Sequence, residues 1–195
     1  MKYIYKTTTY FQMTTRAAPH PLRKGVTSMR EAVWEARENR DMYTGLKRSQ
    51  MKKEDQNVDH VLEIQLIEYA TLEIVSRNAE LVRTFRDIIS EPLNLNVTRR
   101  QVNQAKRGPF TAALNRLKKR DGALREISVA QLARAGKAKV LVDDGTWANV
   151  ESEIALSYEA FQKRVGEARL TRAQDRITSE AMDSLHATLE KIQIF

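Results

Sequence analysis

Three long stretches of this sequence place their apolar residues at the three-to-four-residue spacing of an amphipathic α-helix. They cover about residues 60–89, 147–165 and 171–189. Such spacing gathers apolar side chains on one helix face, which has to be buried against another element. Only 7 glycines and 4 prolines interrupt the 195 residues, and the 42% of hydrophobic residues is enough for a core. We therefore predict a mainly α-helical protein with a small β content.

Short motifs predict where several helices begin and end. Residues 28–31, 98–101 and 171–174 each place a hydroxyl three residues before Glu or Gln, the spacing of a capping box. Gly108–Pro109 is expected to stop the helix that starts at Thr98, and Gly166 the helix near 147–165. The remaining predictions are a strand or arm over 2–13, a loop over 17–25, a helix from 28 to about 39, a continued helix over 110–119, a helix ending at 135, a strand over 139–142 and an Asp-Gly turn at 144–145.

The residue types that are missing exclude several classes of protein. The chain has no cysteine, so it can form neither a disulfide framework nor a zinc site built from cysteines. No stretch approaches the roughly 20 apolar residues of a membrane span. Met1–Gln12 lacks the apolar run of a signal peptide. We expect a soluble protein, cytoplasmic or nuclear, with no membrane partner.

The excess positive charge is concentrated in one segment. The chain has 33 Lys and Arg against 25 Asp and Glu, and the window from Thr98 to Arg120 holds eight bases and no acid. Outside this window 25 bases balance 25 acids. Such a concentration is typical of a surface that contacts phosphates. A solvated helix face beside an acidic neighbour would give the same pattern.

Three short motifs follow one another around this basic segment. They are Asp59–His60, Asn94–Leu95, and Asn103 with Lys106 three residues later. Asn103 falls nine residues after Asn94. This order and spacing resembles the HNH or ββα-metal endonucleases. In that family a strand carries the first pair, a loop leads to Asn-Leu, and a short helix presents His or Asn before Lys. The resemblance implies an HNH-like ββα-metal centre embedded in a helical domain.

The resemblance also implies a chemical role for each motif residue. His60 would be the general base, since an imidazole with a pKa near about 6.5 can accept a proton from water at neutral pH. Asp59 and Asn103 would be metal ligands, because their oxygens suit Mg²⁺ or Mn²⁺. Asn94 would brace the loop that orients His60 for catalysis. The predicted nucleic-acid contacts are Arg99, Arg100, Lys106, Arg107, Arg116, Lys118 and Lys119.

The chain also differs from the common family pattern. Cys-x-x-Cys pairs often surround the metal helix, whereas Arg99 and Val102 stand at those positions here. The interval from His60 to Asn94 is 34 residues, and its content indicates a helical insertion. The segment DHVLEIQ also resembles some fungal toxin-like nucleases, which makes Glu63 and Gln65 possible additional site residues.

These observations predict a metal-dependent endonuclease, with DNA slightly favoured over RNA as substrate. The expected organisation is an N-terminal arm and helix (1–57), a nuclease core (58–120) and a C-terminal helical region (121–195), in one compact domain. If the protein is a toxin, an inhibitor protein is an expected partner. Two alternatives remain: a nucleic-acid-binding protein without catalysis that uses residues 98–120, and an interaction protein that docks an acidic partner. In those cases Asp59 would simply cap a helix starting at His60.

Overall fold

The computed structural model describes residues 22, 25–119, 128–136 and 142–194. Within this part the chain is mainly α-helical and contains one small two-stranded sheet, as the sequence predicts. The expected strand at 2–13, nearly all of the 17–25 loop and residues 139–141 of the expected strand lie outside the described residues.

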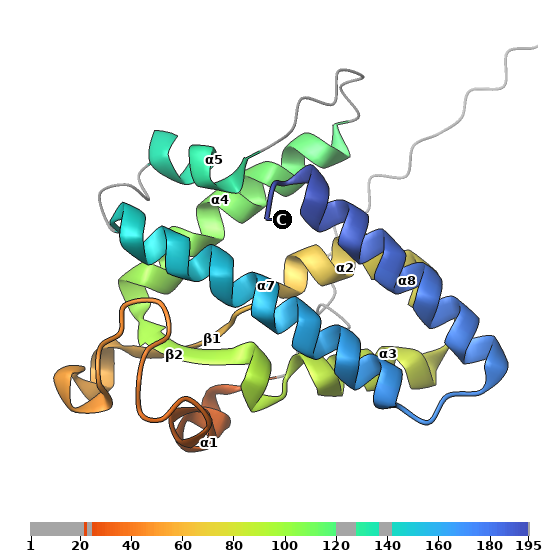
Figure 1. The fold of residues 1–195 in the computed structure, drawn as a ribbon, viewed down its shortest axis with the longest axis horizontal. Coiled ribbons are helices and arrows are strands. Elements are labelled where there is room, and N and C mark those ends of the chain that lie inside the picture. The colour runs from red at the N-terminus through yellow and green to blue at the C-terminus, as the bar shows by residue number, and fades with distance from the viewer. Residues whose placement is uncertain (1–21, 23–24, 120–127, 137–141, 195) are drawn as a thin grey trace, which may run out of the picture.

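Helices form most of the described chain, and the small sheet lies toward one end of the molecule (Figure 1). The α-helices are α1 (Arg30–Ala36), α2 (Ile64–Val75), α3 (Ala79–Ile89), α4 (Arg100–Lys118), α5 (Val129–Ala135), α7 (Asp144–Glu167) and α8 (Arg172–Lys191). The strands are β1 (Gln56–His60) and β2 (Leu95–Arg99), and short 3-10 turns occur at Thr27–Met29, Arg48–Gln50, Lys53–Asp55 and Pro92–Asn94.

The two strands pair antiparallel although α2 and α3 separate them in sequence. Gln56 lies opposite Arg99, and His60 lies opposite Leu95. Because side chains alternate along a strand, those of Val58 and His60 project from one face of the sheet and that of Asp59 projects from the opposite face. The pairing excludes the alternative in which Asp59 caps a helix, since Asp59 lies within β1.

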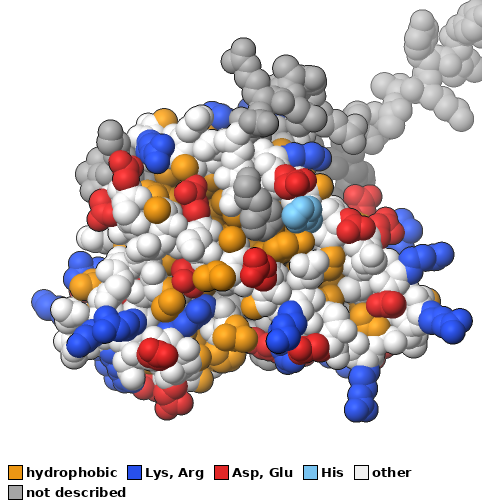
Figure 2. All heavy atoms as spheres, viewed as in Figure 1, with side chains coloured by type: hydrophobic (Ala, Val, Ile, Leu, Met, Phe, Trp, Pro, Cys, Tyr) orange, Lys and Arg blue, Asp and Glu red, His pale blue; other side chains and the backbone are white. Residues whose placement is uncertain are grey.

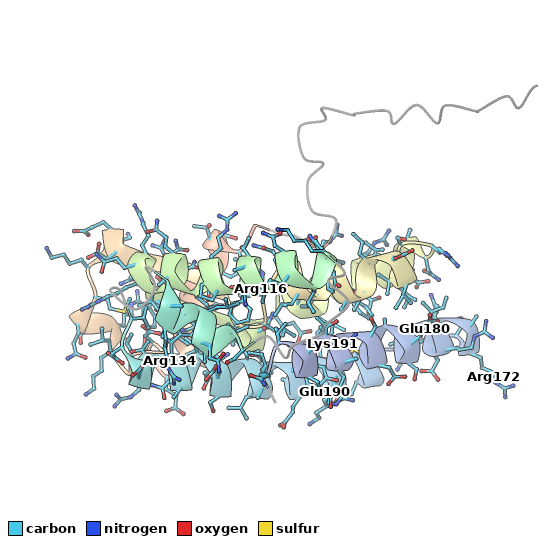
Figure 3. The ribbon with its side chains drawn as sticks, turned by 90° about the horizontal axis from the view of Figure 1, so that it is seen from above. Arg116, Arg134, Arg172, Glu180, Glu190 and Lys191 are labelled. Atoms are coloured by element: carbon cyan, nitrogen blue, oxygen red, sulfur yellow. The ribbon has the colours of Figure 1, made fainter. Side chains whose placement is uncertain are left out.

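The buried apolar side chains form two groups, and the smaller one contains the buried apolar residues of the sheet. The larger core joins side chains of α2, α3, α4, α5, α7 and α8. A second cluster packs Val33 and Trp34 of α1 against Leu95 and Val97 of β2. In Figure 1, α7 and α8 run across the side that faces the viewer, and Figure 3 shows them as a layer separate from α4.

The predicted helix starts differ in outcome. The capping box at 171–174 forms, with Thr171 Oγ1 accepting from Gln174 N at 3.3 Å and Gln174 Oε1 accepting from Thr171 N at 2.9 Å. The other two boxes do not form. Residues 27–29 make a 3-10 turn before α1, which ends at Ala36, and Thr98 belongs to β2, where its hydroxyl bonds Asp41.

The breaks predicted at Gly108–Pro109 and at Asp144–Gly145 are wrong. α4 runs from Arg100 to Lys118 through Gly108 and Pro109. A proline normally clashes with the Cβ of the preceding residue in a helix, and Gly108 has no Cβ. α7 ends at Glu167, one residue beyond Gly166, where its end was predicted. Residues 144–145 form the first turn of α7, which Asp143 caps by accepting from Thr146 N. The predicted helix to Ala135 is confirmed as α5.

In the described residues we find no helix that combines the length and the apolar character needed to cross a lipid bilayer.

Candidate functional site

A polar cavity of about 270 Å³ lies where the end of β1 meets the start of α2 and the first turns of α4. Five of the sequence-predicted site residues line it. They are Asp59, His60, Glu63, Gln65 and Asn103. Arg107, a predicted phosphate contact, lines it as well and is exposed. Pairing β1 with β2 places α4 beside β1, so the fold brings together the first and last of the three motifs.

Lys106 lies behind this cavity in a buried cluster of oxygen atoms. Its ammonium donates to Asp59 Oδ2 at 2.5 Å and to the carbonyl of His60 at 2.6 Å. Glu63 Oε1, the carbonyl of Val61 and the hydroxyl of Tyr43 each lie 3.2 Å from Nζ. The Lys106 side chain is only 1% exposed, so this interaction takes place in a low-dielectric environment.

Burial and charge set the protonation of this cluster. Burial alone would lower the pKa of Lys106, but the carboxylates of Asp59 and Glu63 more than offset it, so its pKa is raised and the ammonium persists. Burial raises the pKa of Glu63, while Lys106 opposes that rise. Burial, followed by the nearby charge of Asp59, also raises the pKa of Tyr43 well above its ordinary value.

This burial corrects the prediction that Lys106 contacts nucleic acid. A phosphate cannot reach an ammonium that is enclosed by protein oxygens, and moving the charge to the surface would leave two carboxylates without their counter-ion. Lys106 is instead a structural cation that joins α4 to the end of β1.

Two residues that the sequence analysis did not single out support Asp59. The Tyr43 hydroxyl donates to Asp59 Oδ2 at 2.8 Å. Asp41, which is fully buried, accepts from the side chains of Asn96 and Thr98 on β2 and thereby fixes the loop that carries Tyr43. The only sequence sign of this role is that Tyr43 is the single aromatic residue of the mainly polar stretch 37–56.

Asn94 has the bracing position that the resemblance implies. Its Oδ1 accepts from Leu62 N at 2.8 Å, its Nδ2 donates to the carbonyl of Ile89 at 2.8 Å, and its own carbonyl accepts from Val61 N. These bonds tie the turn that follows His60 to the end of α3. Asn94 is 4% exposed and does not line the cavity, so it acts on His60 through the backbone.

The other predicted phosphate contacts are exposed but lie apart from the cavity. Arg99 ends β2, and with Arg100 it borders a separate hollow. Arg116, labelled on α4 in Figure 3, lies about 20 Å along the helix from Asn103 at 1.5 Å per residue. Lys118 and Lys119 follow it and are also exposed.

The donor atoms of the cavity fit the kind of metal that the resemblance implies. Mg²⁺ is usually bound by one or two carboxylates and several waters, and Asp59 and Asn103 offer one carboxylate and one amide oxygen. Asp59 uses Oδ2 for Lys106 and Tyr43, so Oδ1 is the oxygen for a further ligand. Across the described residues no three His, Asp or Glu side chains form a metal-holding group.

Comparisons with protein-family models, with characterised proteins and with solved structures gave no match for this chain.

Proposed function

We propose that this protein is an endonuclease that hydrolyses phosphodiester bonds at the cavity between β1, α2 and α4. The observation that carries the proposal is the meeting of His60, Asp59, Asn103 and Arg107 at one cavity, from segments more than 40 residues apart in sequence. An imidazole, hard oxygen donors and a guanidinium are the groups that phosphodiester hydrolysis needs.

His60 is the proposed general base. It ends β1 and lines the cavity as a partly exposed residue whose Nε2 is shielded from solvent. In this proposal a bound phosphate brings the attacking water to the imidazole, which accepts its proton. The backbone of His60 is held from two sides, by Lys106 on its carbonyl and by the Asn94 brace on the turn that follows. This fixed backbone reduces the reorganisation that the proton transfer requires.

Arg107 and Asn103 have complementary roles in this proposal. Arg107 contributes a positive charge at the cavity, where it binds the phosphate and stabilises the charge that develops on its oxygens. Asp59 and Asn103 would hold Mg²⁺ or Mn²⁺, and a bound ion acts as a Lewis acid on the phosphate. Lys106 binds and orients the Asp59 carboxylate rather than touching substrate.

The test compares His60→Ala with His186→Ala, which removes an exposed histidine from α8. Plasmid DNA and transfer RNA are each incubated with wild type and both variants, in Mg²⁺, in Mn²⁺ and in chelator. Loss of a general base lowers the rate about 10²–10⁴-fold, so His60→Ala should lose cleavage while it retains binding and fold. His186→Ala should cleave like wild type.

The outcomes separate the proposal from its alternatives. Cleavage that persists in His60→Ala removes the assigned base. A wild-type protein that binds both nucleic acids in chelator but cleaves neither under any condition is a binding protein, whose affinity should fall steeply as salt rises.

A further inference from the structure

A second and larger cavity, of about 620 Å³, lies next to the start of β1. Its walls come from α1, from the turn that follows α1, and from the segment between that turn and β1. Five basic residues line it, against the two acidic residues Glu31 and Glu38. The basic residues are Arg30, Arg40, Lys47, Arg48 and Lys53. We call this feature the basic cavity.

The positive charge of the basic cavity is only partly balanced within the described chain. Arg48 holds Glu31 through two bonds, of 2.7 and 3.0 Å, which pairs one base with one acid. The remaining four bases face one further acid, Glu38. Arg30 Nε is shielded from solvent and has no hydrogen-bond acceptor among the described residues. An anion is therefore the ligand that the cavity's charge favours.

The walls of the basic cavity are fixed by hydrogen bonds. Gln56 accepts from the indole of Trp34 at 3.2 Å and donates to the carbonyl of Met51 at 3.1 Å. The amide of Arg48 donates to the carbonyl of Asn39 at 2.8 Å, beside the bridge between Arg40 and Lys47. Because these bonds hold the backbone of the cation-bearing segments, little ordering is needed when a ligand binds.

The basic cavity and the candidate active site lie along the same strand. Gln56 lines the first, Val58 and His60 line the second, and alternation places these three side chains on one face of β1. At about 3.3 Å per residue, Gln56 and His60 are roughly 13 Å apart. Neighbouring phosphates of an extended single strand lie roughly 6–7 Å apart, about twice the 3.4 Å by which a strand rises along a duplex axis, so this span covers about two steps between three phosphates.

We propose that the basic cavity binds a backbone phosphate of the same nucleic-acid strand whose scissile phosphodiester lies at His60. The inference rests on the proposed function, and it adds a length requirement to the substrate. A strand of about four nucleotides, which has three internucleotide phosphates, is the shortest that reaches both places. Figure 2 shows basic side chains, with acidic ones among them, over the end of the molecule formed by the segment that precedes β1.

The experiment measures oligonucleotide binding in a His60→Ala background, which prevents cleavage. Arg40→Gln with Lys53→Gln removes two charges from the basic cavity, and Arg172→Gln with Lys163→Gln removes two exposed charges from α8 and α7 as the matched control. Fluorescence anisotropy gives the affinity for a single-stranded 12-mer and a 3-mer over a range of salt concentrations. Circular dichroism checks that each variant is folded.

The cavity variant should bind the 12-mer at least about 10-fold more weakly and lower the salt slope by about 0.7 for each lost phosphate contact. Its affinity for the 3-mer, which cannot span both places, should change less than about threefold. The control should lose less than about threefold for either length. Equal losses in both double variants would show a general charge effect and overturn the inference.

Two further arms keep this inference distinct from the proposed function. In the first, polyglutamate replaces the oligonucleotide. If the cavity variant still binds the 12-mer like its parent but loses the binding of polyglutamate, the basic cavity binds an acidic polypeptide and the inference is overturned. With His60 intact, the cavity variant should raise KM for a 12-mer and leave kcat within about twofold. A wild type without cleavage refutes the proposed function, while the binding comparison still decides on the basic cavity.

Discussion

Replacing Lys106 by methionine tests the buried charge cluster that holds the candidate site together. The substitution keeps a long apolar stem but removes the ammonium, which lies 2.5 Å from Asp59 Oδ2 and 3.2 Å from Glu63 Oε1. Both carboxyl groups are largely buried, with 7% and 12% of their side chains exposed. The variant therefore leaves two acidic groups in the protein interior without their cation.

The expected cost follows from that geometry. Removing one partner of a buried ion pair lowers the free energy of unfolding by about 3–5 kcal/mol. For a chain of this size each kcal/mol shifts Tm by about 2–4 °C, so the Tm of Lys106→Met should fall by roughly 6–20 °C. Lys163→Met, on an exposed position of α7, is the matched control and should stay within about 0.5 kcal/mol of wild type.

Urea unfolding followed by circular dichroism measures both variants, and a triple variant identifies the cause. Adding Asp59→Asn and Glu63→Gln to Lys106→Met removes the uncompensated charges, so the triple variant should be more stable than Lys106→Met alone. A Lys106→Met protein as stable as the Lys163→Met control would refute the buried cluster. A triple variant that recovers nothing would show that lost packing, not stranded charge, causes the destabilisation.

Three other measurements test separate parts of the structure. Asn94→Ala should lower the free energy of unfolding in urea by about 2–4 kcal/mol, because the amide of Leu62 and the carbonyl of Ile89 lose their buried hydrogen-bond partner. An unchanged urea midpoint would contradict the bracing role. Above pH about 10 the folded state holds the Tyr43 proton that the unfolded chain releases, so the free energy of unfolding should fall as pH rises. Tyr43→Phe should make this fall less steep, by up to about 1.4 kcal/mol per pH unit. Equal pH dependence in wild type and Tyr43→Phe would refute the raised pKa of Tyr43. Gly166→Ala should raise stability by up to about 1 kcal/mol, because Gly166 lies in the last turn of α7 and its added Cβ meets open space. A loss of stability would show that the backbone at Gly166 is not helical.

The sequence predicted much of the helical framework because the apolar spacing that defines a helix face is a local property. The stripe that contains Ala181, Leu185 and Leu189 is buried along α8, and the capping box at Thr171 forms. The same local rules failed at Thr98 and at Gly108–Pro109. There the pairing of β2 with β1 and the packing of α4 outweigh capping and helix-breaking preferences, which contribute only about 1–3 kcal/mol each.

For the candidate site, too, some features could be predicted from the sequence and others depended on tertiary packing. Order and spacing were enough to propose Asp59, His60, Asn103 and Arg107, and these four residues line one cavity. The buried position of Lys106 could not be read from its neighbours, since exposure depends on what packs against a helix face.

The sequence by itself determined the helical class, the concentration of positive charge in residues 98–120 and a set of polar residues at suggestive intervals. Only the tertiary structure decided which charges face solvent and which face one another. Strand pairing across a 34-residue insertion brings Asp59 to Lys106, and the loop held by Asp41 brings Tyr43 to both. Such contacts join distant segments, and their strength depends on burial, which periodicity and spacing along the chain do not specify.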